Sequence, residues 1–165
     1  MSDIFKALCQ DVTDEKFFGI CDDKPHERAY LDTEYPNKWL ATVQNKSKKE
    51  ITFTALDNCI EMRGIDGKMS SRCEGLLTYN DTIIFVEAKE RDGDSGTWAK
   101  KADGQLRISI DNLKTKVDLS GFKNKRAAIT NRKQNRFNKK HSVRIKKFFE
   151  DTGYILSVDS RITID

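Results

Sequence analysis

A hairpin in the middle of the chain would bring two glutamates and a lysine together. Two runs rich in β-forming residues flank Asn80 and Asp81, a two-residue turn of the kind that hairpins use. With that turn, Glu74 lies directly opposite Glu87, with Cβ atoms about 5 Å apart. Glu87 and Lys89 are two residues apart on one strand, so their side chains share a face. The spacing predicts two carboxylates and an ammonium group at one place on a sheet.

Opposed carboxylates repel one another, so this hairpin is destabilised unless something neutralises them. A divalent cation is one candidate, because Mg²⁺ takes hard oxygen ligands and often needs only one or two protein carboxylates. Lys89 could then orient or deprotonate a water, or offset charge that grows on a phosphate. A site for phosphodiester hydrolysis is one interpretation. A ladder of surface ion pairs on a solvated sheet face is the other.

Hydrophobic periodicity predicts the elements that would position these groups. The expected elements are a helix in the first 20 residues, a strand at 51–56, hairpin strands at 74–79 and 82–89, a helix from 97 to 113, a strand at 126–131, a basic amphipathic helix from 137 to 149 ended by Gly153, and last strands at 154–158 and 161–164. The first helix depends on an apolar stripe of Ile4, Phe5, Leu8 and Val12. Gly104, inside the second helix, indicates a close approach of another backbone. The mixed order predicts a single α/β or α+β domain over residues 1–165, with helices flanking the sheet.

An E-x-K pair at the end of an apolar strand, after an acidic residue on the partner strand, resembles the PD-(D/E)xK nuclease superfamily. The core order of that superfamily, αβββαβ, is similar to the order expected here, and the likeness covers roughly residues 39–131. It implies a restriction-endonuclease-like core, α/β in class, with a central mixed sheet of four to five strands. By this resemblance Glu74 is the first metal-binding acidic residue, and Glu87 and Lys89 form the E-x-K pair.

The same resemblance implies two further site residues. The family tends to supply a glutamate from the helix before the sheet, for which Glu27 is the candidate metal ligand, with Glu15 and Glu34 behind it. Some branches carry a glutamine in the following helix, and Gln105 resembles that residue. Glu74 stands where the family usually has aspartate, and no proline precedes it. These departures leave open a catalytically silent member of the fold.

The formal net charge of +4 hides a strongly basic stretch. Of the 30 Lys and Arg residues, eleven lie between Leu119 and Phe149, where there is no Asp or Glu, and the other 19 stand against 26 acidic residues. Such a stretch indicates nucleic acid, although a solvated basic face explains the charge equally well. The residues expected to contact phosphates are Lys123, Lys125, Arg126, Arg132, Lys133, Arg136, Lys139 and Lys140. The first 35 residues are acidic and could instead bind a partner protein.

The four cysteines form no C-x-x-C pair, so reduced thiols are expected. Cys59 and Cys73, with Asp57 nearby, could be metal ligands, but small buried thiols are the simpler interpretation. The first residues lack the features of a signal peptide, and no apolar run is long enough for a membrane helix. A cytoplasmic protein without membrane association is therefore expected.

Taken together, these features predict a metal-dependent nuclease that hydrolyses phosphodiester bonds, with DNA as the expected substrate. Mg²⁺ is the expected cofactor and Mn²⁺ its substitute. The alternative is a catalytically silent module with the nuclease fold that binds nucleic acid or a partner protein. A homodimer is a further expectation.

Overall fold

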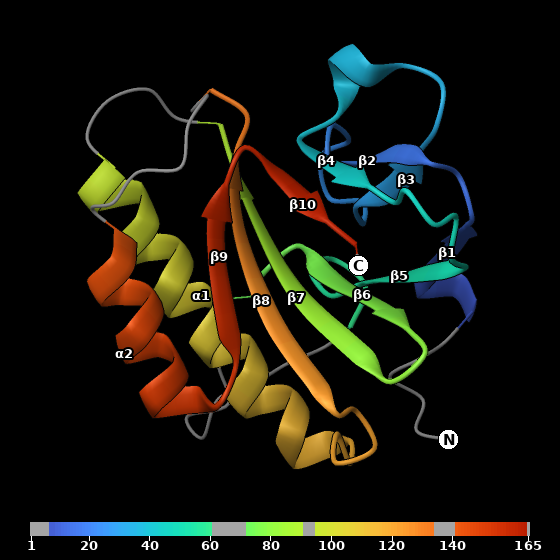
Figure 1. Ribbon diagram of the computed structural model, residues 1–165. Coiled ribbons are helices and arrows are strands. Elements are labelled where there is room, and N and C mark those ends of the chain that lie inside the picture. Colours follow the sequence, from blue (N-terminus) through green and yellow to red (C-terminus); the bar gives the residue numbers. More distant parts are fainter. Residues whose placement is uncertain (1–6, 61–71, 91–94, 134–140, 165) are drawn as a thin grey trace.

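The computed structural model describes residues 7–60, 72–90, 95–133 and 141–164 (Figure 1). In chain order the elements are η2 (Ala7–Cys9), β1 (Gln10–Thr13), β2 (Phe17–Cys21), β3 (Tyr30–Asp32), η3 (Pro36–Lys38), β4 (Ala41–Gln44), β5 (Ile51–Ala55), β6 (Gly75–Tyr79), β7 (Thr82–Lys89), α1 (Ser95–Lys116), β8 (Asn124–Asn131), α2 (Ser142–Thr152), β9 (Ile155–Asp159) and β10 (Arg161–Thr163).

The larger sheet has six strands in the order β1-β5-β6-β7-β8-β9. Strands β1, β5, β6 and β7 pair antiparallel, whereas β7, β8 and β9 pair parallel. Every residue of β7 except Lys89 is buried. A nearly continuous apolar run of this kind suits a strand that is covered on both faces. Glu87, near the end of β7, is therefore placed inside the protein.

A second sheet of four strands has the order β10-β4-β2-β3. The prediction of a helix in the first 20 residues is wrong, because β1 and β2 occupy much of that segment. The two described residues of the predicted apolar stripe are exposed, Leu8 by 73% and Val12 by 58%. Phe18 and Ile20 instead enter the core from β2, with the period of two that a strand has. The expected single sheet of four to five strands is therefore wrong: β1 joins the larger sheet as its sixth strand, and β2, β3 and β4 build a second sheet with the carboxy-terminal β10.

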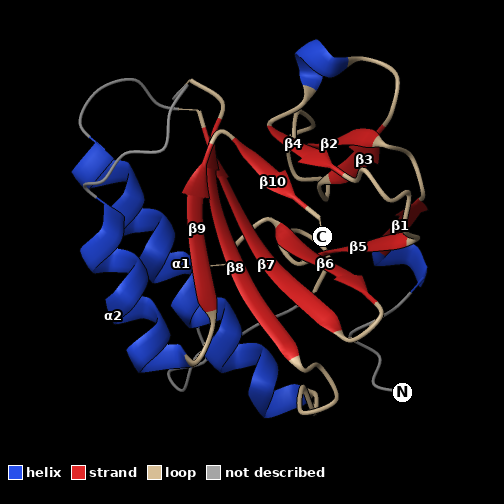
Figure 2. Ribbon diagram, viewed as in Figure 1, coloured by secondary structure: helices blue, strands red, loops and turns tan. Residues whose placement is uncertain are grey.

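The elements form three layers. Helices α1 and α2 cover one face of the six-stranded sheet, and the four-stranded sheet lies against the other face (Figures 1 and 2). On the helix side the core contains the fully buried side chains of Phe85 and Phe148, and between the sheets it contains Phe53 and Ile84. Burial of each such side chain contributes about 1.5–3 kcal/mol, so packing on both faces stabilises the central strands. The α/β class is confirmed.

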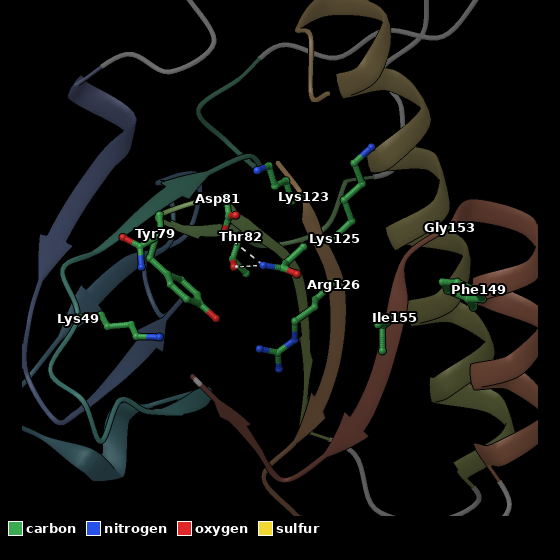
Figure 3. A pocket seen from close by; sticks show the side chains of 12 residues that line it. Lys49, Tyr79, Asp81, Thr82, Lys123, Lys125, Arg126, Phe149, Gly153 and Ile155 are labelled. Atoms are coloured by element: carbon green, nitrogen blue, oxygen red, sulfur yellow. Dashed lines mark hydrogen bonds between the residues drawn. The ribbon is translucent and has the colours of Figure 1, made fainter. Parts of the chain in front are cut away.

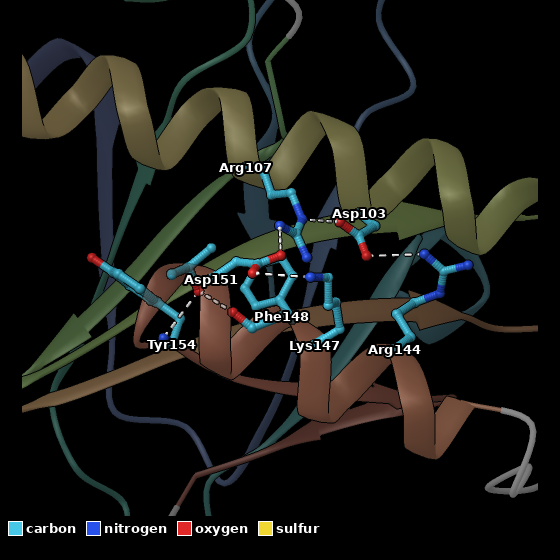
Figure 4. Close-up of polar contacts among 8 residues, drawn as sticks. Asp103, Arg107, Arg144, Lys147, Phe148, Asp151 and Tyr154 are labelled. Atoms are coloured by element: carbon cyan, nitrogen blue, oxygen red, sulfur yellow. Dashed lines mark hydrogen bonds and ion pairs between the residues drawn. The ribbon is translucent and has the colours of Figure 1, made fainter.

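An ion-pair network joins α1 to α2 (Figure 4). Asp103 of α1 accepts hydrogen bonds from Arg107 on its own helix and from Arg144 of α2, the latter at 2.9 Å. Arg107 also reaches Asp151 of α2 at 2.8 Å, and Lys147 lies 3.4 Å from the same carboxylate. Arg144 and Lys147, both members of the basic stretch, thus face carboxylates of the protein itself.

Glycine positions show where the backbones come close. The expected close approach at Gly104 is wrong, because a Cβ added there would meet nothing within 4 Å. The close contact lies instead at Gly75 in β6, where a Cβ would be 2.4 Å from the carbonyl oxygen of Thr54 in β5. Gly153 ends α2 in the left-handed conformation with φ of 79°, as its position after the amphipathic helix predicted.

The expectation of four reduced thiols is wrong for one pair. Cys9 and Cys59 form a disulfide that joins residues 50 apart in the sequence, and Cys21 and Cys73 are free and buried. The bond follows from the pairing of β1 with β5, since Cys9 directly precedes β1 and Cys59 lies in the turn after β5. The proximity of Cys9 and Cys59 was not predicted from the sequence, because a helix was expected where β1 is. Within the described ranges, no helix combines the length and apolar character needed to cross a membrane.

Candidate functional site

The hairpin of β6 and β7 has the predicted register. Pairing runs from Tyr79 with Thr82 to Gly75 with Val86. The backbone N–H of Glu74 then donates to the carbonyl of Val86 at 3.1 Å, so Glu74 and Gly75 both lie opposite Val86, as in a β-bulge. The predicted direct pairing of Glu74 with Glu87 is therefore wrong, although the two carboxyl groups are close enough that the charge of Glu87 raises the pKa of Glu74. The carbonyl of Glu74 accepts from the backbone N–H of Leu56, in the segment after β5.

Glu87, Lys89 and Gln105 form a connected group. The Nζ of Lys89 lies 2.9 Å from Oε2 of Glu87 and donates to Oε1 of Gln105 at 2.7 Å. Glu87 is only 2% exposed, and the side chain of Lys89 is 13% exposed. The interpretation of these residues as a surface ladder is therefore wrong, because α1 covers this face of the sheet. Gln105, carried over from a family resemblance alone, is positioned by α1 against Lys89.

Two aspartates that the sequence analysis did not assign to the site also lie close to it. Asp22 follows β2 and forms a hydrogen bond with Glu74. Asp57 lies two residues after β5, and its negative charge raises the pKa of both Glu74 and Glu87. Asp57 is held in place by Arg72, at 3.1 Å. We refer to Glu74, Glu87, Asp22 and Asp57 as the acidic cluster. The available signal was that each aspartate comes just after an apolar strand, where side chains gather at a sheet edge.

The surroundings of Glu74 and Glu87 disfavour the ionised form of both carboxyl groups. Burial raises the pKa of Glu74 well above its usual value, and the charge of Glu87 and the hydrogen bond with Asp22 raise it further. Burial also raises the pKa of Glu87, although the neighbouring ammonium group of Lys89 lowers it in part. A proton or a cation between Glu74 and Glu87 would relieve this repulsion.

The glutamates proposed from the preceding helix do not join this group. Glu27 lies in an exposed turn, where its N–H donates to the carbonyl of Lys24 at 3.2 Å, because the expected helix around it is replaced by turns and β3. Glu15 and Glu34 line a separate pocket beside β1 and β3. The carboxylate that this part of the chain brings to Glu74 is that of Asp22.

The residues predicted to bind nucleic acid lie at opposite ends of β8. Arg132 and Lys133 follow its last residue, Asn131, which pairs with Lys89 in the register of β7 and β8. Arg132 forms an ion pair with Glu90 at 2.8 Å and donates to the carbonyl of Trp39 at 2.8 Å, so it also ties the two sheets together.

The other described residues that were predicted to bind nucleic acid lie at the beginning of β8. Lys123, Lys125 and Arg126 line a pocket at the beginning of β8. Asn131 is six positions after Lys125 in β8, a distance of roughly 20 Å at about 3.3 Å per residue. Arg136, Lys139 and Lys140 lie outside the described residues. The basic stretch is therefore divided between two places and forms no continuous face in the described part of the chain.

The cysteine alternative for a metal site is not supported. Cys59 is held in the disulfide, and burial raises the pKa of Cys73, so its thiol stays protonated. Among the described side chains, no three of the His, Cys, Asp and Glu type are placed to hold one metal ion together. The chemistry of the site therefore depends on the pair Glu74 and Glu87.

Comparison of the chain with known protein families, curated proteins and solved structures found no match.

Proposed function

We propose that this protein is a metal-dependent nuclease of the PD-(D/E)xK type that hydrolyses phosphodiester bonds, with DNA as its substrate. The observation that carries the proposal is that Glu74, directly before β6, lies close to Glu87 and Lys89 of β7, in the spacing of the family motif and with Glu87 only 2% exposed. The succession of β5, β6 and β7, then α1 and the parallel strand β8, supports a restriction-endonuclease-like core.

The donor set of the acidic cluster fits a divalent cation. Glu74 and Glu87 present hard carboxylate oxygens, and both have raised pKa values because they are buried close together. Mg²⁺ commonly uses one or two protein carboxylates and keeps water and phosphate oxygens as its other ligands. Glu74 and Glu87 would hold the ion, and Asp22 lies within reach of Glu74. When bound, such an ion lowers the pKa of a water that attacks the phosphodiester.

The other residues of the site orient charge. Lys89 is held between Glu87 and Gln105, so its ammonium group keeps a fixed position. From there it offsets negative charge that develops on the phosphate, without reorganisation during the reaction. Gln105 is fixed in turn by α1 and by a hydrogen bond from its Nε2 to the carbonyl of Arg72 at 3.4 Å. Arg132 and Lys133, at the same end of β8, are the described members of the basic set closest to such a substrate.

A cleavage assay tests this function. Full-length protein is incubated with single- and double-stranded DNA and with RNA, with Mg²⁺ or Mn²⁺ or with a chelator. We expect metal-dependent cleavage that falls about 10²–10³-fold in Lys89→Met, as for the loss of one preorganised charge in an active site. Glu87→Gln should abolish cleavage, whereas Lys101→Met, an exposed lysine of α1, should leave it unchanged. A folded protein that cuts none of these substrates with either metal contradicts the proposal.

A second candidate is a catalytically silent module with the same fold. The observation in its favour is that Lys89 already pairs with Glu87 at 2.9 Å, so the ammonium group can replace a metal ion in neutralising that carboxylate. Thermal unfolding with increasing Mg²⁺ distinguishes the two candidates. A rise in Tm that disappears in Glu87→Gln supports the nuclease, and an unchanged Tm in both proteins supports the silent module.

The cellular setting stays a prediction. We propose a cytoplasmic location, but the Cys9–Cys59 disulfide removes the support that reduced cysteines gave it, since disulfides are rare in the cytosol. A homodimer or a protein partner likewise stays a prediction.

A further inference from the structure

A pocket lined by basic residues lies at the end of the six-stranded sheet that is opposite to the acidic cluster. It is a pocket of about 460 Å³ between the β6–β7 turn, the beginning of β8 and the beginning of β9. This volume falls in the range of pockets for small organic ligands. Four of its lining residues are basic, namely Lys49, Lys123, Lys125 and Arg126. Its acidic lining residue, Asp81, accepts a hydrogen bond from the side chain of Asn124 at 3.2 Å.

Lys49 and Arg126 approach the same open space, with the hydroxyl of Tyr79 beside it (Figure 3). Lys123 and Lys125 extend to another side of the pocket in the same view. Lys49 enters from the segment before β5, and its Nζ lies 5.3 Å from the centre of the Tyr79 ring. Arg126 enters from β8, where its guanidinium group donates to the carbonyl of Thr163 at 3.1 Å. Two cationic groups and a hydroxyl donor, from strands β6 and β8 and the segment before β5, thus converge on one place.

The position of Lys49 is fixed by a buried side chain. Asn45 is fully buried, and its amide group donates to the carbonyls of Lys49 and Glu15 at 2.8 and 3.2 Å while its oxygen accepts from the N–H of Lys49 at 3.1 Å. A loop held in this way places its lysine at low entropic cost, which favours binding.

The lysines of the pocket form no close ion pair in the described part of the chain, although the charge of Lys125 helps to lower the pKa of Asp118. Among the described ion pairs, none within 4.0 Å involves Lys49, Lys123 or Lys125. The pocket rim also carries Phe149 and Ile155, which are 53% and 60% exposed. A ligand that suits this lining has an anionic group for the cations and a flat or apolar group for the rim.

We propose that this pocket binds the phosphate of a nucleotide between Lys49 and Arg126, with the sugar or base against the apolar rim. The nucleotide is either free or one unit of a nucleic acid, because both present the same phosphate beside a base. This site goes beyond the proposed nuclease function, since none of its lining residues belongs to the group of Glu74, Glu87, Lys89 and Gln105. In β8 the partner of Glu87 is Ile129, three residues from Arg126, which is roughly 10 Å along the strand.

Isothermal titration calorimetry of the full-length protein in a chelator tests the site without any cleavage. The probes are adenosine 5′-monophosphate, adenosine, inorganic phosphate and a single-stranded DNA 12-mer. We expect the monophosphate to bind at least tenfold more tightly than adenosine or phosphate. Lys49→Gln should weaken this binding about tenfold, as for the loss of one charge-assisted hydrogen bond, whereas Lys46→Gln on the same exposed loop should not.

Two further variants keep the test independent of folding and of the nuclease proposal. Tyr79→Phe retains the buried ring and should weaken binding several-fold through the lost hydroxyl. Glu87→Gln should bind the monophosphate like the wild type, whether or not the protein is a nuclease. Binding of the 12-mer that also weakens in Lys49→Gln identifies a nucleic-acid unit as the ligand, and binding of the monophosphate alone identifies a free nucleotide. Equal binding by Lys49→Gln and Lys46→Gln, equal affinity for adenosine, or loss of binding in Glu87→Gln would overturn the proposal.

Discussion

Glu74 and Glu87 occupy a place in the protein where a negative charge is costly. Burial raises the pKa of each carboxyl, and the two charges repel one another across the hairpin. The folded protein therefore holds a proton on Glu74 at pH values where the unfolded chain has lost it. Such a group lowers stability as the pH rises, which is the sign opposite to that of a salt-bridged carboxylate.

Stability should therefore depend on pH through Glu74. Below the usual pKa of glutamate, both states carry the proton and there is no penalty. As the pH rises from that value through the raised pKa, the free energy of unfolding falls, and the full penalty is present above it. Glu74→Gln should raise the free energy of unfolding at pH 7 by about 1 kcal/mol or more, since a tenfold change in an acid constant corresponds to about 1.4 kcal/mol.

Urea unfolding between pH 4 and pH 8, followed by tryptophan fluorescence, measures this effect. The matched control is Glu50→Gln, an exposed glutamate just before β5, which should change stability little. A Glu74→Gln protein that is less stable than the wild type at pH 7, with the same pH dependence, would show that the carboxylate is stabilised in the fold by a partner.

At the scale of elements, the hairpin depends on how closely β5 and β6 approach. Gly75 lies directly after Glu74 and faces the backbone of Thr54 and the ring of Phe53. A side chain here would push β6 away from β5 and displace Glu74. The absence of a side chain at Gly75 is therefore part of how the sheet positions the acidic cluster.

Two glycine substitutions should have opposite effects. Gly75→Ala places a Cβ 2.4 Å from a backbone oxygen, so we expect a loss of about 1–3 kcal/mol, as for overpacked cores. Gly104→Ala in α1 meets nothing within 4 Å and should gain about 1 kcal/mol, because alanine favours the helix. Thermal or urea unfolding of both variants checks the pair. A Gly75→Ala protein as stable as the wild type would show that β6 does not need to approach β5 this closely.

At the scale of the whole molecule, the disulfide connects the amino-terminal segment to the turn that follows β5. Cys9 precedes β1, and Cys59 is two residues after Asp57 of the acidic cluster. The bond closes a loop that contains the four strands from β1 to β4 and the whole of β5. Loop closure of this size restricts the unfolded chain and so stabilises the fold.

Reduction should lower stability by about 4 kcal/mol, the chain-entropy value for a loop of 50 residues. Urea unfolding with and without a phosphine reductant measures the difference. The double variant Cys9→Ser/Cys59→Ser should be destabilised to a similar extent and should not respond to the reductant. Thiol titration of the denatured, unreduced protein should find two free cysteines, Cys21 and Cys73. Four free thiols would show that the bond does not form.

The central part of the fold could be predicted because its signals are local. The turn at residues 80 and 81 and the strands on either side set the register of β6 and β7, from Tyr79 with Thr82 to Gly75 with Val86. The amphipathic pattern predicted α1 and α2, and Gly153 marked the end of α2. The amino-terminal strands were missed because they are short, and the exposed Leu8 and Val12 imitate a helical stripe.

The sequence by itself determined the carboxylate pair, the lysine beside it and the α/β succession around them, because strand alternation and turn geometry act over a few residues. Only the tertiary structure decided that Glu87 is buried under α1, that Asp22 and Asp57 join it and that Cys9 meets Cys59. It also divided the basic stretch between the two ends of β8. These features depend on strands that pair across many residues of sequence, and no local pattern specifies which distant strand becomes a neighbour.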